Sequence, residues 1–239
     1  MKRVRHVHIY KSPWHALVTF AFILAPLIIL IAFSQAALGS SYRLFGDLGV
    51  STARMFVGFI FSALFAWVFA VAMYKRANTV VLPLFDVLQS FPAFAILPIV
   101  TYLFGASEWV ILAFLFLNIT WPIFFSVLTS LRLIRRDWEE AVEIMGLKGW
   151  PYYLKFLIPA SLPGLITGSI IGLGDGWQAL VATEVIVQTK IGLGGFFDLH
   201  ATDPAITTYG VLVFLAFIFI INRLIWTPLM LWSQKQMEE

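Results

Sequence analysis

The sequence contains no cysteine. It therefore has no disulfide framework, no thiol nucleophile and no thiolate metal site. It also lacks any Gly-x-x-x-x-Gly-Lys-Ser/Thr stretch, the glycine-rich loop that cradles phosphates in many ATPases. The chain is therefore not expected to hydrolyse ATP by itself.

Charged residues are scarce, at 12% of the 239 residues, whereas hydrophobic residues make up 60%. Soluble domains have about 25% charged residues. The mean hydropathy of +0.89 and several apolar runs near the ~20 residues that cross a bilayer predict an all-α integral membrane protein. The net charge of +3 is small and does not indicate a nucleic-acid surface.

Six apolar segments predict about six transmembrane helices in a single domain over 16–232. The first could instead be a cleaved signal peptide, but its apolar core exceeds the roughly 7–15 residues typical of one, which favours a retained span. Pro83, Pro92 and Pro98 each remove a backbone donor, so we expect a short helix or broken segment over 80–92 before the third span. The predicted spans are 16–33, 55–74, 93–104, 110–131, 162–187 and 209–232.

Lysine and arginine are distributed unevenly among the segments between these spans. With an even number of spans, one side of the membrane holds both the basic tail 1–15 and the tail 233–239, together with the loop 132–159. The loops of the other side carry very few basic residues, one of them Arg43 in the loop predicted over 34–50. The positive-inside rule therefore places both termini and the loop 132–159 in the cytoplasm, with the chain in the inner or plasma membrane of the cell.

The loop 132–159 is the longest polar interruption between two apolar segments, and its pattern predicts two short amphipathic helices. Asp137 can N-cap the first helix, with Glu140 at the N3 position of a capping box. Gly146 is placed to take the left-handed conformation that ends the helix. The helix then has an apolar face formed by Ala141, Ile144 and Met145.

A second short helix is predicted over 151–157. Pro151 suits its first turn, and Pro159 is expected to lie beyond its end. A membrane protein that builds a capped helix pair in a connecting loop is expected to present it to a partner outside the bilayer.

The stretch Glu140-Ala141-Val142, followed by three residues, Gly146 and later Ile158-Pro159, resembles the EAA loop of ABC importer permeases. The spacing of that motif is intact, although Val142 stands where the family has a second alanine. The alternative is an ordinary cytosolic loop with a good N-cap, because a motif is a hypothesis until its structural context agrees.

The resemblance extends over most of residues 50–200 and is to the nitrate/sulfonate/taurine-type permeases. One departure is Ile170, where many of these permeases carry arginine. The resemblance implies a MetI-like permease fold with cytoplasmic coupling helices over 137–157. It is carried by Arg54, Gly58, Pro83, Asp86, Gln89, Pro92, Pro98, Gly105, Leu162, Pro163, Gly168, Trp177, Ala179, Glu184, Gly192, Leu193 and Gly194.

The same resemblance implies that the chain is the non-catalytic permease subunit of an ABC importer. Its implied partners are an ABC ATP-binding subunit, a second permease copy that is expected to be identical, and a periplasmic or lipid-anchored substrate-binding protein. ATP and magnesium would be bound by the ATPase, and this chain would bind no cofactor. Coupling to the ATPase is implied for Asp137, Glu140, Ala141, Ile144, Met145, Gly146 and Pro159.

Polar residues at membrane depth are expected either to line a solute pathway or to make structural hydrogen bonds, because burying a charge there costs roughly 2.5–3.5 kcal/mol. Asp175 lies among Gly172, Gly174 and Gly176, which predicts either a locally unwound helix or close helix packing. The candidates for pathway or gate are Asp86, Gln89, Pro92, Asp175, Trp177 and Glu184.

Two other functions compete with the permease interpretation. A stand-alone secondary transporter or channel would need coupling ions, and the few buried charges of this chain offer little to bind them. A membrane-embedded enzyme would need a cluster of His, Asp and Glu or a Ser/His set, and no such cluster is visible in the sequence. The residues do not identify the transported solute.

Overall fold

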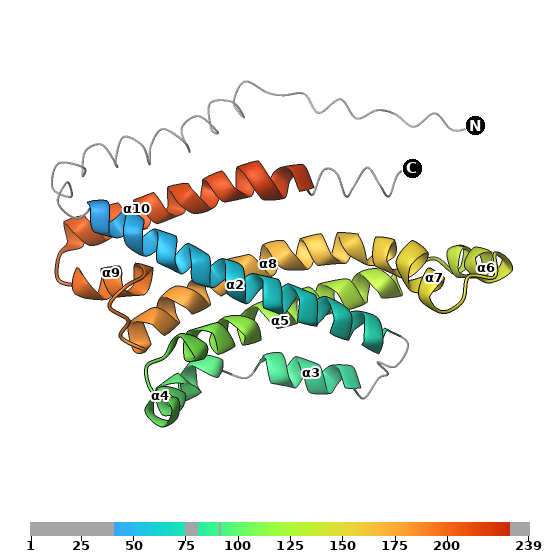
Figure 1. The fold of residues 1–239 in the computed structure, drawn as a ribbon, viewed down its shortest axis with the longest axis horizontal. Helices are drawn as coiled ribbons and strands as arrows, with labels where there is room; N and C mark the ends of the chain where they lie inside the picture. The colour runs from blue at the N-terminus through green and yellow to red at the C-terminus, as the bar shows by residue number, and fades with distance from the viewer. Residues whose placement is uncertain (1–40, 75–80, 91, 230–239) are drawn as a thin grey trace, which may run out of the picture.

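The computed structural model describes residues 41–74, 81–90 and 92–229, and all regular structure in these ranges is helical (Figure 1). This confirms the predicted all-α class. The predicted tails and the first span, 16–33, lie outside the described residues. The helices are α2 Ser41–Met73, α3 Val81–Gln89, α4 Ala93–Phe104, α5 Glu108–Arg132, α6 Arg136–Ile144, α7 Trp150–Tyr152, α8 Ile158–Ile186, α9 Leu193–Leu199 and α10 Pro204–Ile221, with π-helical segments η1 Tyr153–Leu157 and η2 Asn222–Trp226.

Within the described ranges, four helices are long and apolar enough to cross a membrane: Tyr42–Met73, Glu108–Arg132, Trp150–Ile186 and Pro204–Leu229. They correspond to the second, fourth, fifth and sixth predicted spans. The third predicted span is α4, whose 12 residues extend about 18 Å. Because the hydrocarbon core is about 30 Å thick, α4 is too short to cross it alone.

The prediction of a loop over 34–50 is wrong for residues 41–50, because helix α2 begins at Ser41. Arg43, Asp47, Ser51 and Arg54 make this region look polar in a hydropathy profile. They recur every three or four residues, which places them on one face of a helix. Three of the four, Asp47, Ser51 and Arg54, are buried, so the polar stripe faces the protein interior rather than water.

The second loop helix does not stop before Pro159, as predicted, but continues through η1 into α8. A proline inside a helix removes one donor and clashes with the carbonyl four residues earlier, here that of Lys155. In the π turn just before it, the Ile158 N–H donates to the Tyr153 carbonyl. The wider turn shifts the bonding by one residue and lets the helix run on.

Helices α5 and α8 form the centre of the molecule, with α2 packed across them (Figure 1). Gly164, Gly168, Gly172 and Gly176 recur at four-residue spacing on the face of α8 that meets α5. A Cβ at Gly168 would stand 2.7 Å from the Ile123 Cα. Small residues at this spacing allow the backbones to approach closely, so the close-packing prediction for Gly172 is correct, and α8 is not unwound there.

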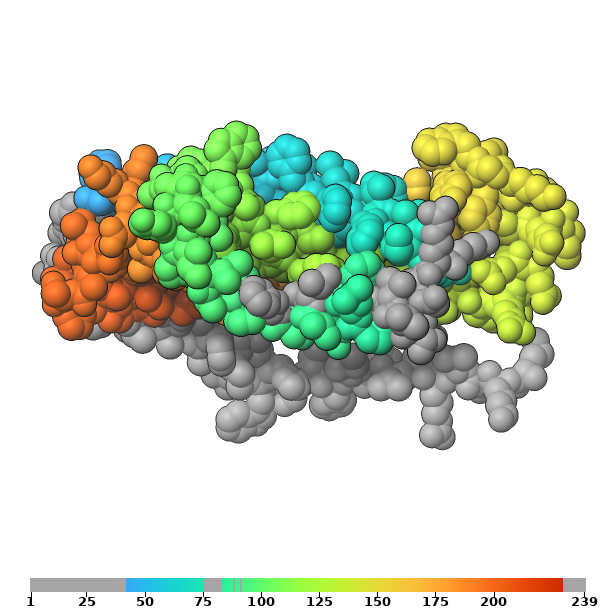
Figure 2. Space-filling view, turned by 90° about the horizontal axis from the view of Figure 1, so that it is seen from below, coloured from blue at the N-terminus to red at the C-terminus, as the bar shows by residue number. Residues whose placement is uncertain are grey.

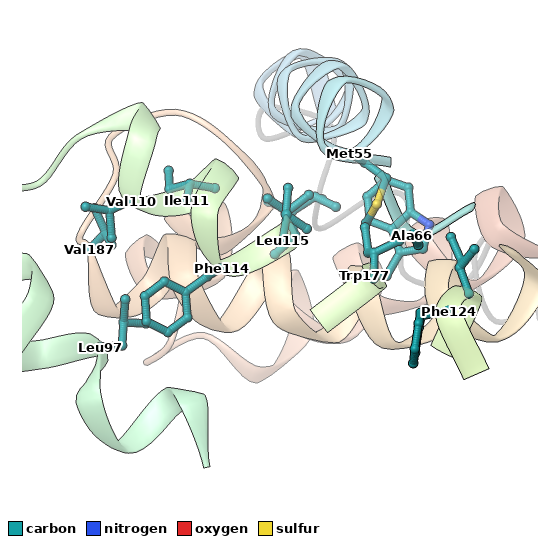
Figure 3. Close-up of a cluster of buried hydrophobic side chains, with 14 of the residues drawn as sticks. Met55, Ala66, Leu97, Val110, Ile111, Phe114, Leu115, Phe124, Trp177 and Val187 are labelled. Carbon is teal, nitrogen blue, oxygen red and sulfur yellow. The ribbon is translucent and has the colours of Figure 1, made fainter. Parts of the chain in front are cut away.

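Helices α2, α5 and α8 contribute most of a continuous apolar core, to which α4, α9 and α10 add. Figure 3 shows Met55 of α2 beside Trp177 of α8, and Leu97 of α4 beside Phe114 of α5. The predicted loop segment 132–159 reaches this core through Leu157, and Ile134, Tyr152 and Phe156 pack against it. Its helices α6 and α7 lie at one end of the molecule, and α9 lies at the other (Figure 1).

Candidate functional site

Helix α6 begins at Arg136, with Arg135 in the N-cap position. The prediction that Asp137 caps it is therefore wrong. The Asp137 carboxylate accepts a hydrogen bond from Arg135 Nη2 at 2.5 Å and lies in the first helical turn. An acidic first turn still favours the helix through its dipole. Because the cap is absent, the capping box with Glu140 is absent too, and Glu140 is solvent-exposed.

The end of α6 follows the predicted pattern. Gly146 has φ +68°, the left-handed conformation that side chains disfavour. The Gly146 N–H donates to the Glu143 carbonyl at 3.0 Å, and the Leu147 N–H donates to the Val142 carbonyl at 3.2 Å. These two bonds form a Schellman motif. Gly146 therefore sets the point at which α6 ends.

One face of α6 presents apolar side chains to solvent. Ile144 is 87% exposed and Met145 is 74% exposed, and Ala141 is also exposed. Val142 points the other way and is buried. Figure 2 shows the α6–α7 region protruding at one end of the molecule. A contiguous exposed apolar face of this kind is typical of a protein–protein contact.

Tyr74, at the end of α2, connects this protrusion to the membrane helices. Its hydroxyl donates to Glu139 Oε1 at 2.8 Å. Burial, and then the hydrogen bond to Glu139, raise the pKa of Tyr74 above its ordinary value, so the phenol stays protonated and remains a donor. The sequence placed Tyr74 at the end of a predicted span. It did not reveal this contact, because Tyr74 and Glu139 are 65 residues apart.

At the opposite end, a buried polar cluster joins α2, α5 and α8. Arg54 donates from Nη1 to Glu184 Oε1 at 2.7 Å and from Nε to Glu108 Oε2 at 2.7 Å, with a second bond from Nη2 to Glu108 Oε1. The Glu184 side chain is 0% exposed, whereas that of Glu108 is 61% exposed. Arg54 thus binds one fully buried carboxylate and one at the surface.

The same cluster satisfies the first backbone donors of α9. The N–H groups of Gly192 and Gly194 donate to Asp47 Oδ1 and Glu184 Oε2, each at 2.8 Å. The Leu193 N–H donates to Ser51 Oγ at 2.8 Å. A helix N-terminus leaves such donors without intrahelical partners. Both carboxylate oxygens of Glu184 therefore accept structural hydrogen bonds, and its role in a pathway or gate stays a prediction.

The other pathway candidates are dispersed. Asp86 and Gln89 are exposed on α3, where Gln89 Nε2 donates to Asp86 Oδ1 at 2.9 Å, and Pro92 is exposed just before α4. Asp175 is exposed on α8. Trp177 is buried and packs edge-to-face against Phe214 and Phe217. The structure does not bring these six residues together.

Sequence reasoning missed a groove of about 1120 Å³ between the end of α5 and the beginning of α8. A signal was present: Ser126, Thr129 and Ser130 recur at i, i+3 and i+4, which places three hydroxyls on one face of the otherwise apolar helix α5. In the described ranges, no group of three or more His, Asp or Glu side chains could hold a metal ion. The groove is lined in part by Ser126, Thr129, Ser130, Arg135, Lys155 and Thr167.

Known proteins resemble this chain over most of its described part. The family model described as "binding-protein-dependent transport system inner membrane component" matches residues 58–226. The nitrate import permease protein NrtB of Leptolyngbya laminosa is 29% identical over 164 residues, which are 66% of this chain and 57% of the relative. The taurine transport system permease protein TauC of Escherichia coli (strain K12) is 27% identical over 181 residues, 73% of this chain and 66% of the relative.

A third relative is the bicarbonate transport system permease protein CmpB of Synechococcus elongatus, 27% identical over 126 residues. Those residues are 53% of this chain and 45% of the relative. The chain therefore spans about half the length of NrtB and of CmpB.

Proposed function

The chain belongs to the family of binding-protein-dependent transport system inner membrane components, whose model matches residues 58–226, and we propose that it is the permease subunit of an ABC importer. In this role it forms the membrane passage for a small solute. It performs no chemistry itself, and ATP hydrolysis takes place on a separate subunit.

The observation that carries this proposal is the exposed apolar face of α6, held at one end of the molecule and ended at Gly146. Ile144 and Met145 offer apolar surface that a cleft on an ATPase would cover. Closure of two ATP-bound subunits would then move α6, and with it the membrane helices. Nucleotide can shift the permease between two states only by binding one of them more tightly.

The description of the family as binding-protein-dependent supports a substrate-binding partner. The relatives are permease proteins for nitrate, bicarbonate and taurine import or transport. We therefore propose a second permease copy, identical to this one, and a substrate-binding protein that delivers the solute from outside. The coupling helix α6 and both termini would face the cytoplasm, since the positive-inside rule places the basic segments there.

The experiment that tests this function is co-purification of the tagged chain from its native membrane in mild detergent. A soluble ATP-binding subunit recovered in stoichiometric amount is the expected result. Repeated recovery of the chain alone, together with transport by the reconstituted chain in the absence of any ATPase, would contradict it in favour of a stand-alone transporter or channel.

Replacing Gly146 by alanine should reduce the recovered ATPase several-fold. A Cβ at Gly146 meets no atom within 4 Å, so the cost comes from φ alone, about 1–2 kcal/mol in the left-handed region. Gly174→Ala is the matched control, because Gly174 also has open space but lies within helix α8. Equal recovery for both variants in quantitative co-purification would argue against a role for the end of α6.

Replacing Tyr74 by phenylalanine should leave the recovered ATPase unchanged and lower solute-stimulated ATP hydrolysis about tenfold. The change removes one hydrogen bond to a charged acceptor, typically worth about 1.5–3 kcal/mol and at the lower end for a half-buried pair. Tyr153→Phe is the control, since Tyr153 lies on η1 at the same end. If stimulation in the Tyr74 variant equals that of the control, α6 does not transmit its motion through α2.

A further inference from the structure

The groove between α5 and α8 lies at the same end of the molecule as α6. It is bounded by Pro122 on α5, by Leu133 just after the end of α5, by Lys155 on η1 and by Ile171 on α8. Its volume of about 1120 Å³ is comparable with the 300–1,000 Å³ typical of small-molecule sites. It therefore has room for a small solute with part of its hydration shell.

Hydroxyl groups line this groove in a part of the chain that is otherwise apolar. Thr129 and Thr167 are exposed, one on each wall, and their hydroxyls have no hydrogen-bond partner among the described residues. Lipid chains offer no hydrogen bonds to such groups, and leaving them unpaired in hydrocarbon costs free energy. The groove is therefore better suited to water and a polar solute than to lipid.

The charges of the lining are of one sign. Arg135 and Lys155 both line the groove, and no Asp or Glu is among its lining residues. Asp137 pairs with Arg135 from outside the groove, which leaves Lys155 as the main source of positive potential. Apolar walls, including Phe125 and Phe156, lower the local dielectric and strengthen the field inside.

We propose that this groove is the inner part of the solute passage and that it accepts a small anion. The proposal rests on the permease function proposed above and adds to it the charge class of the solute and the residues that select it. Lys155 attracts the anion, and the hydroxyls of Thr129 and Thr167 replace part of its hydration.

The absence of native cysteine makes a direct test possible. Thr167→Cys is introduced into the full chain, purified with its co-purifying subunits and placed in lipid nanodiscs, where both membrane faces are open. Its rate of modification is measured with an anionic reagent, sulfonatoethyl methanethiosulfonate, and a cationic one, trimethylammonioethyl methanethiosulfonate. With each rate divided by that reagent's rate with a free thiol in solution, we expect the anionic reagent to react about tenfold faster, since focused potentials raise counter-ion concentrations by 10-fold or more.

Two variants make the outcome specific. Adding Lys155→Glu should reverse the preference between the two reagents. Leu215→Cys, on an exposed part of α10 outside the groove, should react with neither. If Thr167→Cys reacts with neither reagent, lipid or a second chain fills the groove; if it reacts equally with both, the groove does not select anions. Either result overturns the proposal, whereas the permease function itself is judged by recovery of the ATPase.

Discussion

Replacing Arg54 by methionine is expected to destabilise the protein by about 3–5 kcal/mol, because it leaves the Glu184 carboxylate buried without its cation. Glu184 is 0% exposed and accepts hydrogen bonds from Arg54, Ser51 and the Gly194 N–H. The remaining neutral donors cannot compensate a full charge in that environment. The midpoint of thermal unfolding in detergent should fall on the order of 10 °C.

Two further variants separate this effect from simple loss of a side chain. Glu108→Gln weakens the other carboxylate partner of Arg54, which is 61% exposed, and should cost at most about 1 kcal/mol. The double variant Arg54→Met with Glu184→Gln removes both buried charges and should recover much of the loss. A double variant no more stable than Arg54→Met would show that the buried charge is not the cause.

Replacing Gly168 by leucine is expected to prevent α5 and α8 from packing and to cost about 3 kcal/mol or more. Even a Cβ at this position would lie 2.7 Å from the Ile123 Cα and 3.0 Å from the Pro122 carbonyl oxygen. Backbone atoms cannot rotate away as the end of a side chain can, so the two helices must separate. The yield of monodisperse protein in size-exclusion chromatography should drop sharply.

Gly174→Leu is the matched control for this change. Gly174 lies on the same helix, six residues away, and a Cβ there meets no atom within 4 Å. The control should therefore elute like the unaltered protein. Normal elution of the Gly168 variant would mean that the α5–α8 contact tolerates a wider separation than the structure indicates.

Local features of the fold were predictable because their physical causes lie within a few residues. Apolar runs identified the second, fourth, fifth and sixth spans, since their hydropathy does not depend on what packs against them. The end of α6 at Gly146 was equally predictable, because only the backbone within one turn decides it.

Two predictions about helix ends failed because the surrounding structure changed the outcome that the residue type favours. Asp137 has the chemistry of an N-cap, but its carboxylate accepts a hydrogen bond from Arg135, and the N-cap position lies two residues earlier, at Arg135. Pro159 has the chemistry of a helix stop, but the π turn over Tyr153–Leu157 accommodates it. In both cases the residue type allowed two outcomes, and the neighbouring geometry selected one.

The sequence by itself determined the membrane class, the order of the helices and the segment for which we propose a partner, because hydropathy, turn chemistry and motif spacing are properties of contiguous residues. Only the tertiary structure decided which polar residues act together. Arg54 and Glu184 are 130 residues apart, and Lys155 meets the Thr129 wall of the groove only because α5 and α8 lie side by side. A charge inside a membrane requires a partner, but its identity depends on helix packing.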